Sequence, residues 1–410
     1  MKETSQSTPT PTPVTEKKRS KFSVAMGAAF MMAMAAVGPG FLTQTAAFTG
    51  QMGANFGFAI LLCIIADIVV QLNIWRIIIV SGKRAQVLAN EVVPGLGYVL
   101  TALIVIGGFC FNIGNIGGAG LGLNVLFGIE PKYGALIAAA AAIIVFVVKN
   151  AMMVVDRTVQ CLAVIKILIL IYILSVTTVP VATAISHTFM PTQINFYSIV
   201  TIVGGTVGGY ISFSGGHRLL EGGVKGRENI KYVNEGALTG IGVASAIRIM
   251  LFLAGLAVVV AGHTLNPANP AASIFQIAAG NFGYKFFGLL LLAAGMTSTL
   301  GSTFTSISFL NYSQNKESWV NKYHSALIIT FILASTLIFY FVGNPAKVLI
   351  IVGALNGMIL PIALAILLVA AVKKSIMGNY KHPKWLLVTG WIVVAFMAYA
   401  AVQSFASIKL

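Results

Sequence analysis

The sequence has few charged residues and almost no acidic ones. Only 9% of its 410 residues are charged, with 10 Asp or Glu against 26 Lys or Arg. Clustered carboxylates, a nucleophile–base pair and a nucleotide-binding loop are all missing, so the sequence does not indicate an enzyme. The three cysteines, Cys63, Cys110 and Cys161, are scattered in apolar stretches, which suggests neither a disulfide framework nor a metal cluster.

The sequence is instead rich in long hydrophobic runs. Hydrophobic residues make up 58% of the chain and the mean hydropathy is +0.91. Many apolar runs reach the roughly 20 residues that a membrane-spanning helix needs. We therefore expect an all-α polytopic protein in the lipid bilayer, with eleven transmembrane helices near residues 22–48, 54–80, 97–127, 133–149, 158–180, 196–220, 236–262, 273–310, 323–342, 346–372 and 385–408.

Basic residues divide the predicted loops into two sets. Residues 1–21 are rich in Ser, Thr and Pro, end in a basic cluster and are too polar to insert. We expect them to form a disordered cytoplasmic tail before a transporter domain at 22–410, and no cleavable signal peptide is visible. The positive-inside rule places the N-terminus in the cytoplasm and the C-terminus outside the plasma membrane. The net charge of +16 lies largely in short loops, which argues against a nucleic-acid partner.

Glycine interrupts two of the predicted spans. Gly38-Pro39-Gly40 breaks the first, and VGGTVGGYISFSGGH at 203–217 places Gly208-Gly209 near the middle of the sixth. A proline inside a helix removes one hydrogen bond. Paired interruptions five spans apart indicate a 5+5 inverted repeat in which the freed backbone groups bind a cargo near the membrane midplane. The open alternative is that the glycines only let helices pack closely.

Four stretches resemble the NRAMP divalent-metal transporters, which have a LeuT-type fold. Gly27 to Phe41 resembles the first helix of the family, with Gly38-Pro39-Gly40-Phe41 on its Asp-Pro-Gly-Asn motif. Residues 205–213 fall on the stretch that holds Met-Pro-His, and 114–129 and 291–303 are similar to the third and eighth spans. The resemblance implies secondary active transport by alternating access, with symport of an ion.

The departures from the family pattern fall on its metal site. A divalent cation needs hard oxygen anions or soft sulfur to replace its water shell. Here glycines, aromatic residues and neutral amides stand at those positions, so we expect the fold to be kept and the metal site to be lost. The family's Asp and Asn ligands fall on Gly38 and Phe41, its Met and His on Gly208 and Tyr210, its acidic pair on Asn112 and Asn115, and a Gln on Met296.

The emptied site is predicted to bind a small organic carboxylate or amino-acid-like compound, without a cofactor. The second half of the broken first helix offers unpaired N–H groups and a positive dipole end to a carboxylate. Any single Ser or Thr could instead bond the carbonyl one turn back. The candidate substrate-binding residues are Gly38, Gly40, Phe41, Thr43, Gln44, Thr45, Asn112, Asn115, Gly208, Gly209, Tyr210 and Ser212.

Two other functions stay open. The chain could carry a divalent ion such as Mn²⁺ or Mg²⁺ on the carbonyls at the two breaks, with the ion keeping several waters. It could also be a transport-inactive membrane component that binds a partner through its cytoplasmic loops. Unwound backbone in two helices is costly without a cargo, which argues against this last function.

Few residues are candidates for ion coupling to Na⁺ or H⁺. Asp67 is the only acidic residue deep in a span, and is either a proton carrier or a partner of Arg76. The other deep basic residues are Lys166 and Arg248. His217, next to Arg218, is predicted to be a surface residue. Thr297, Ser298 and Thr299 offer hydroxyl groups where LeuT-type transporters often hold sodium.

Overall fold

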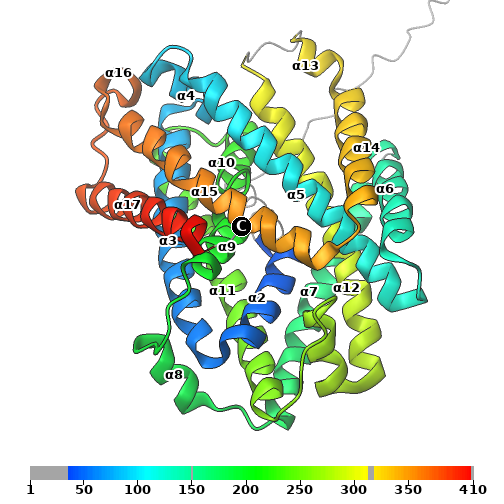
Figure 1. Cartoon of the computed structure of the whole chain (residues 1–410). Helices are drawn as coiled ribbons and strands as arrows, with labels where there is room; N and C mark the ends of the chain where they lie inside the picture. Colours follow the sequence, from blue (N-terminus) through cyan, green and yellow to red (C-terminus); the bar gives the residue numbers. More distant parts are fainter. Residues whose placement is uncertain (1–35, 149–150, 313–317, 408–410) are drawn as a thin grey trace, which may run out of the picture.

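The computed structural model describes residues 36–148, 151–312 and 318–407. The predicted tail at 1–21 and most of the first predicted span lie outside this part of the chain. Every regular element in the described ranges is a helix, and the helices form the bundle seen in Figure 1. The predicted all-α class is therefore confirmed.

The first half of the chain runs from the broken first helix to a short helix at one end of the bundle. Its elements are α2 (Pro39–Met52), η1 (Gly53–Asn55), α3 (Phe56–Ser81), α4 (Ala85–Val92), α5 (Leu96–Phe127), α6 (Pro131–Val147), α7 (Ala151–Val176) and α8 (Val181–Phe189).

The second half begins with the two pieces of the broken sixth span. Its elements are α9 (Phe196–Val207), α10 (Ile211–Glu221), η2 (Arg227–Asn229), α11 (Ile230–Val260), α12 (Pro270–Leu310), α13 (Trp319–Lys322), α14 (His324–Val342), α15 (Pro345–Val372), α16 (Lys374–Met377) and α17 (Lys384–Ser407).

Eight helical stretches in the described residues are long and apolar enough to cross a membrane. A ninth is counted if Val164–Val176 and Val181–Phe189, which are bent by 110°, form one span, and Pro131–Val147 is a shorter apolar helix. The predicted number of eleven is not confirmed. One reason is that α2 and α3, predicted as separate spans, are joined only by η1 and form one stretch, Pro39–Ser81.

Short helices mark the two ends of the bundle. In Figure 1, α4, α13 and α16 lie at one end and α8 lies at the other. The three helices at the first end lie next to loops whose basic residues predict a cytoplasmic position. The arrangement is therefore consistent with the predicted alternation of the loops.

Small residues on α5 hold the neighbouring helices close. A Cβ on Gly118 would collide with the Pro39 ring of α2, and one on Gly122 would lie 2.6 Å from the backbone nitrogen of Leu292 in α12. Close backbone approach at small residues is how helices pack where lipid supplies no hydrophobic driving force. As a result, the start of α2 packs directly against α5.

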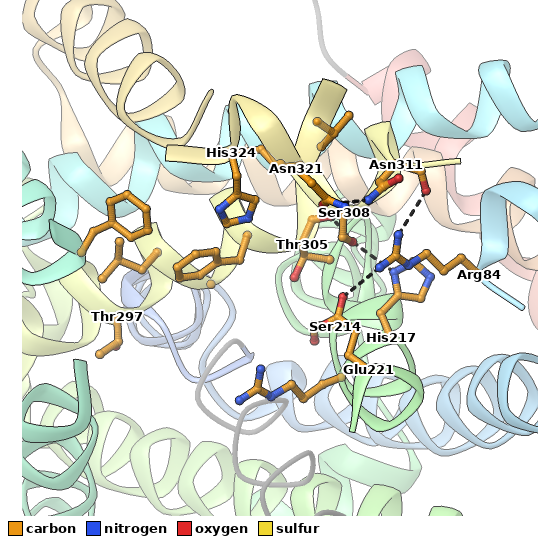
Figure 2. Close-up of a pocket in the computed structure, with 17 residues that line it drawn as sticks. Arg84, Ser214, His217, Glu221, Thr297, Thr305, Ser308, Asn311, Asn321 and His324 are labelled. Carbon is orange, nitrogen blue, oxygen red and sulfur yellow. Dashed lines mark hydrogen bonds and ion pairs between the residues drawn. The ribbon is translucent and has the colours of Figure 1, made fainter. Parts of the chain in front are cut away.

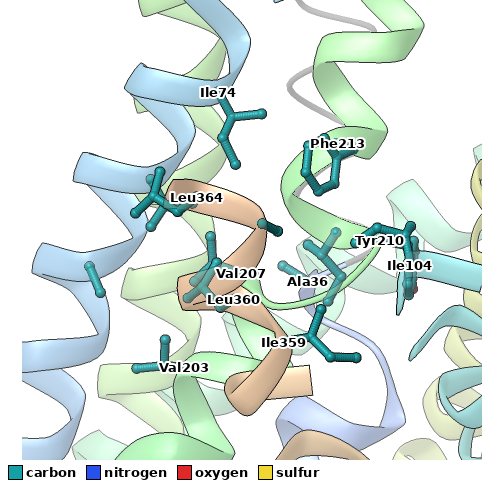
Figure 3. Packing of buried hydrophobic residues seen from close by; sticks show 14 of the residues in the cluster. Ala36, Ile74, Ile104, Val203, Val207, Tyr210, Phe213, Ile359, Leu360 and Leu364 are labelled. Carbon is teal, nitrogen blue, oxygen red and sulfur yellow. The ribbon is translucent and has the colours of Figure 1, made fainter. Parts of the chain in front are cut away.

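Apolar side chains surround both breaks. Figure 3 shows Val203 and Val207 of α9 packed with Leu360 and Leu364 of α15, and Tyr210 lies in the same buried cluster. A second buried cluster contains Phe41 together with residues of α7, α11 and α12. Backbone freed from helical hydrogen bonds is therefore enclosed in protein, as a membrane requires.

Candidate functional site

The first break begins at Gly38. This glycine is extended (φ −79°, ψ −175°), and Pro39 occupies the first turn of α2. At that position the missing N–H of proline costs no helical hydrogen bond, and its fixed φ suits the helix. The proline therefore begins a half-helix, and the backbone is interrupted at the predicted Gly38-Pro39-Gly40.

The second break lies between α9 and α10. Gly208 is extended (φ −78°, ψ 164°) and Gly209 has a φ of +55°, which favours glycine. A Cβ on Gly209 would also collide with the side-chain oxygen of Asn356 in α15. Both backbone conformation and space therefore require glycine at position 209.

Residues of α5, α10 and α12 meet at the first break. A Cβ on Gly38 would lie 2.7 Å from Ser298 Oγ and 3.7 Å from Asn115 Oδ1. The Asn115 side chain also interacts with the hydroxyl of Tyr210, which is packed edge-to-face on Phe111 with ring centroids 5.3 Å apart. We call Gly38, Asn115, Gly209, Tyr210 and Ser298 the break site. A carboxylate-bearing side chain at position 38 would require Ser298 to move.

Several buried polar atoms around the break site have no hydrogen-bond partner in the described part of the chain. A buried group left in this way costs about 1–3 kcal/mol. Such atoms mark a place where a ligand or water completes the bonding. They are Thr43 Oγ1, Gln44 Oε1, Asn115 Nδ2, Ser298 Oγ, Thr299 Oγ1 and Asn356 Oδ1.

Two of these side chains, Gln44 and Asn356, connect a break to a neighbouring helix. Gln44 donates from Nε2 to the carbonyl of Leu349 at 2.7 Å, and it fits between Gly205 and Gly353 because a Cβ on either would collide with it. Asn356 donates to Gly107 O at 3.2 Å and to Val352 O at 3.0 Å. Asn356 was not predicted from the sequence, although an amide in so apolar a span is itself a signal.

Other predicted site residues are already hydrogen-bonded within the protein. Thr45 donates to Phe41 O at 2.7 Å, one turn back, and the Ser212 hydroxyl donates to Val207 O across the second break. The Asn112 amide is satisfied on both sides, by Ser335 at 2.8 Å and by Ser302 at 2.9 Å. For these residues a contact with substrate stays a prediction.

Asp67 does not pair with Arg76. The Arg76 Nε donates to Asn234 Oδ1 at 3.0 Å, and the cation that acts on Asp67 is Arg248 of α11. The guanidinium carbon of Arg248 lies 3.9 Å from the centre of the Phe41 ring. A buried cation therefore lies beside the broken first helix and acts on the buried Asp67, an arrangement that the sequence did not reveal.

A cavity of about 550 Å³ opens near the ends of α10 and α12. Figure 2 shows Thr297 at one side of it and Arg84 and Glu221 at the other. Thr297 donates to the carbonyls of Ala293 and Ala294, both at 3.1 Å, and it precedes Ser298 of the break site. The cavity therefore reaches the part of α12 that carries the break site.

The prediction that His217 is a surface residue is wrong. His217 is 3% exposed because α4 and α12 cover it, and its ring stacks on Phe309. Its Nε2 accepts the backbone N–H of Ala85 at 3.3 Å, so Nδ1 carries the proton and donates to Ser308 Oγ at 3.2 Å. His217 is thus held as a neutral ring.

Arg84 joins the same end of the bundle. It donates to the carbonyl of Asn311 at 3.2 Å and pairs with Glu221 at 3.4 Å, as the dashed lines in Figure 2 show. We call Arg84, His217, Glu221, Ser308 and Asn311 the clasp. It ties the ends of α10 and α12 to the start of α4.

Comparisons with known proteins agree with this architecture. Residues 29–407 match the family described as Natural resistance-associated macrophage protein-like, or Nramp. An uncharacterized membrane protein of Bacillus subtilis, YcsG, is 54% identical over 388 residues that cover 95% of each chain. An uncharacterized membrane protein of Haemophilus influenzae is 51% identical and covers 91% of this chain and 93% of its own.

Solved structures support the predicted fold. A manganese transporter of Eremococcus coleocola has a TM-score of 0.70 at 16% identity, covering 98% of this chain and 91% of its own. MhsT in complex with L-phenylalanine has a TM-score of 0.62 at 17% identity, covering 93% and 98%. At these identities the likeness concerns the fold, and it confirms the predicted LeuT-type class.

Proposed function

The chain belongs to the Nramp family of membrane transporters, and from this premise we propose that its cargo is a small organic carboxylate or amino-acid-like compound. The family makes it a secondary transporter and not an enzyme. The proposal concerns what the transporter carries.

The residues at the two breaks are the observation that supports the proposal. Gly38, Phe41, Gly208 and Tyr210 stand where the NRAMP resemblance has its metal ligands, and none of them offers an anionic or sulfur ligand. In the described ranges of the chain, no group of three or more His, Cys, Asp or Glu residues lies close enough together to hold a metal ion. A dication entering this site would exchange its water for neutral groups only.

The same site suits a carboxylate. The first turn of α2 leaves backbone N–H groups unpaired, and its dipole favours negative charge. The Asn115 amide, which interacts with Tyr210, can donate at this level, and in the described part of the chain the buried hydroxyls of Thr43 and Ser298 have no partner. Phe41 and Tyr210 add apolar ring surface for the rest of a small molecule.

A divalent metal ion is the second candidate cargo. The observation in its favour is the fold shared with the Eremococcus coleocola manganese transporter, at a TM-score of 0.70. Free oxygens of Gln44, Thr43 and Asn356 could face a hydrated ion. Such a site would depend on retained waters, as Mg²⁺ sites commonly do.

We further propose ion coupling and a membrane orientation. Among the residues that the structure describes, the hydroxyls of Ser298 and Thr299 have no partner, and Ser298 faces Gly38, which suits Na⁺. Asp67 is the candidate if H⁺ is the coupling ion. The loop charges and the position of α4, α13 and α16 support a cytoplasmic N-terminus and an outside C-terminus in the plasma membrane.

Thermal unfolding of the purified protein tests the cargo class. A ligand at 100 times its Kd stabilises a protein by about 2.7 kcal/mol, which is readily measured. The screen takes the twenty amino acids, C2 to C6 carboxylates, Mn²⁺ and Mg²⁺, each with and without sodium. We expect a saturable shift with at least one acid and none with either metal. A saturable shift with Mn²⁺ or Mg²⁺ alone contradicts the proposal.

A further inference from the structure

Arg248 places a buried positive charge next to the broken first helix. The side chain comes from α11, a long apolar helix, and is 1% exposed. Its guanidinium lies over the face of Phe41, 3.9 Å from the ring centre, and Phe41 belongs to the first turn of α2. The charge is therefore fixed at the level where the helix begins after its break.

Most of the hydrogen-bonding capacity of this guanidinium is unused. Nη1 donates to the Sγ of Cys63 at 3.0 Å, while Nε and Nη2 have no partner among the residues that the structure describes. Arginine does not deprotonate in proteins, and an unpaired charge in the interior is costly. Ionisable side chains retained inside membrane proteins usually serve function.

The two unused nitrogen atoms form the edge that recognises carboxylates. Nε–H and Nη2–H point the same way from the planar guanidinium, so they can donate two parallel bonds to the two oxygens of one carboxylate. Such a pair also restores charge balance, because it brings an anion to the buried cation.

An acidic side chain of α3 lies near this guanidinium. Asp67 acts on Arg248 electrostatically, but the two are not joined by an ion pair within 4.0 Å in the described ranges. Asp67 Oδ1 is buried without a hydrogen-bond partner in the described residues, and the Gln71 side chain interacts with Asp67. The competing interpretation is that Asp67 pairs with Arg248 in another state, which would make Arg248 a structural residue.

We propose that the free Nε/Nη2 edge of Arg248 binds the carboxylate of the transported solute beside Phe41. This inference rests on the proposed function, since it names the protein group that holds the acid. It adds a fixed cation from α11 to the neutral groups of the break site.

Binding measurements on variants of the full chain test the inference. The probes are L-proline, L-alanine and L-lactate, each paired with its primary amide, together with whichever further acid stabilises the wild type in the thermal screen. For the bound acid we expect Arg248→Gln to weaken binding at least a hundredfold and Arg248→Lys about tenfold, because lysine keeps the charge but loses the fork. Arg76→Gln, in which the replaced guanidinium bonds Asn234, is the matched control and should stay within twofold.

The amide probes keep the test decisive if Arg248→Gln does not fold, as judged by size exclusion and unfolding without ligand. The wild type should prefer the acid to its amide at least a hundredfold, and Arg248→Lys should reduce that preference. Unchanged acid binding in Arg248→Gln, or an unchanged preference in Arg248→Lys, overturns the role of Arg248 and leaves the proposed function standing. Stabilisation by Mn²⁺ or Mg²⁺ with no acid active contradicts the proposed function itself.

Discussion

The break site and the clasp are both polar, but they differ in how many of their buried hydrogen-bonding groups are paired. In the clasp, both nitrogens of His217 are engaged and Arg84 bonds two other segments. Of the clasp residues, Asn311 alone has a buried side-chain atom, Oδ1, without a partner in the described part of the chain. Around the break site, Asn115, Ser298 and Thr299 keep buried atoms without partners. Unsatisfied buried groups reduce stability, so they are kept where a ligand supplies the missing bonds. The difference favours a ligand at the break site and a structural role for the clasp.

The largest expected effect comes from Gly209→Ala. The new Cβ would sit at a φ of +55° and collide with Asn356, so we expect loss of ligand binding and a destabilisation well above that of the control. Overpacking costs about 1–3 kcal/mol beyond the strain of the backbone. The control is Gly343→Ala, whose φ of +70° is similar but whose Cβ meets nothing within 4 Å. Equal unfolding temperatures for the two variants would contradict the packing at the second break.

The second largest effect is expected from a negative charge at the first break, which should weaken the binding of the acid. Gly38→Asp places a carboxylate where Ser298 must rotate aside, near the expected acid. Like charges about 8 Å apart at an effective dielectric of 20 repel by about 2 kcal/mol, or about thirtyfold in Kd. Gly38→Asn has the same size without the charge and shows the steric effect alone. If titration calorimetry finds that both variants bind the acid equally well, the carboxylate does not bind at this helix end.

The clasp should respond weakly. Glu221→Gln removes the 3.4 Å ion pair with Arg84, and both side chains are partly exposed. Pairs of this kind contribute about 0–1 kcal/mol. We expect a small fall in unfolding temperature and unchanged ligand binding. A loss of binding as large as that of the break-site variants would remove the distinction between the two regions.

An effect of pH on stability is expected at His382, between α16 and α17. Burial, with the positive charge of Arg76, lowers the pKa of His382 to about 4. Unfolded histidine titrates near 6.5, so between pH 6.5 and 4 only the unfolded chain gains this proton and stability falls as pH falls. His382→Gln should flatten that dependence in unfolding measured from pH 7.5 to 4.5. An identical slope in the variant would show that other groups cause the pH dependence.

The sequence predicted the parts of the fold that local chemistry controls. Pro39 between two glycines disfavours a continuous helix and the pair Gly208-Gly209 weakens one, so both breaks were predicted from the local sequence. The transporter class followed from the resemblance of the flanking stretches. The span count could not be confirmed, because η1 is too short to separate α2 from α3 clearly.

The missed features depend on contacts between distant segments. Asn356 reaches Gly107 across 249 positions, and Arg248 reaches Cys63 across 185. His217 was misplaced because its neighbour Arg218 suggested a surface, whereas Ala85 and Ser308 cover it. No local pattern encodes such partners, so only the packed structure reveals them.

Uptake into proteoliposomes shows directly whether the protein carries an organic acid or a metal ion. The purified protein is reconstituted and given either the radiolabelled acid that stabilises it or radiolabelled Mn²⁺, with an inward Na⁺ or H⁺ gradient. We predict saturable uptake of the acid, driven by one of the gradients and unaffected by excess Mn²⁺. Saturable uptake of Mn²⁺ with no uptake of the acid would contradict the loss of the metal site.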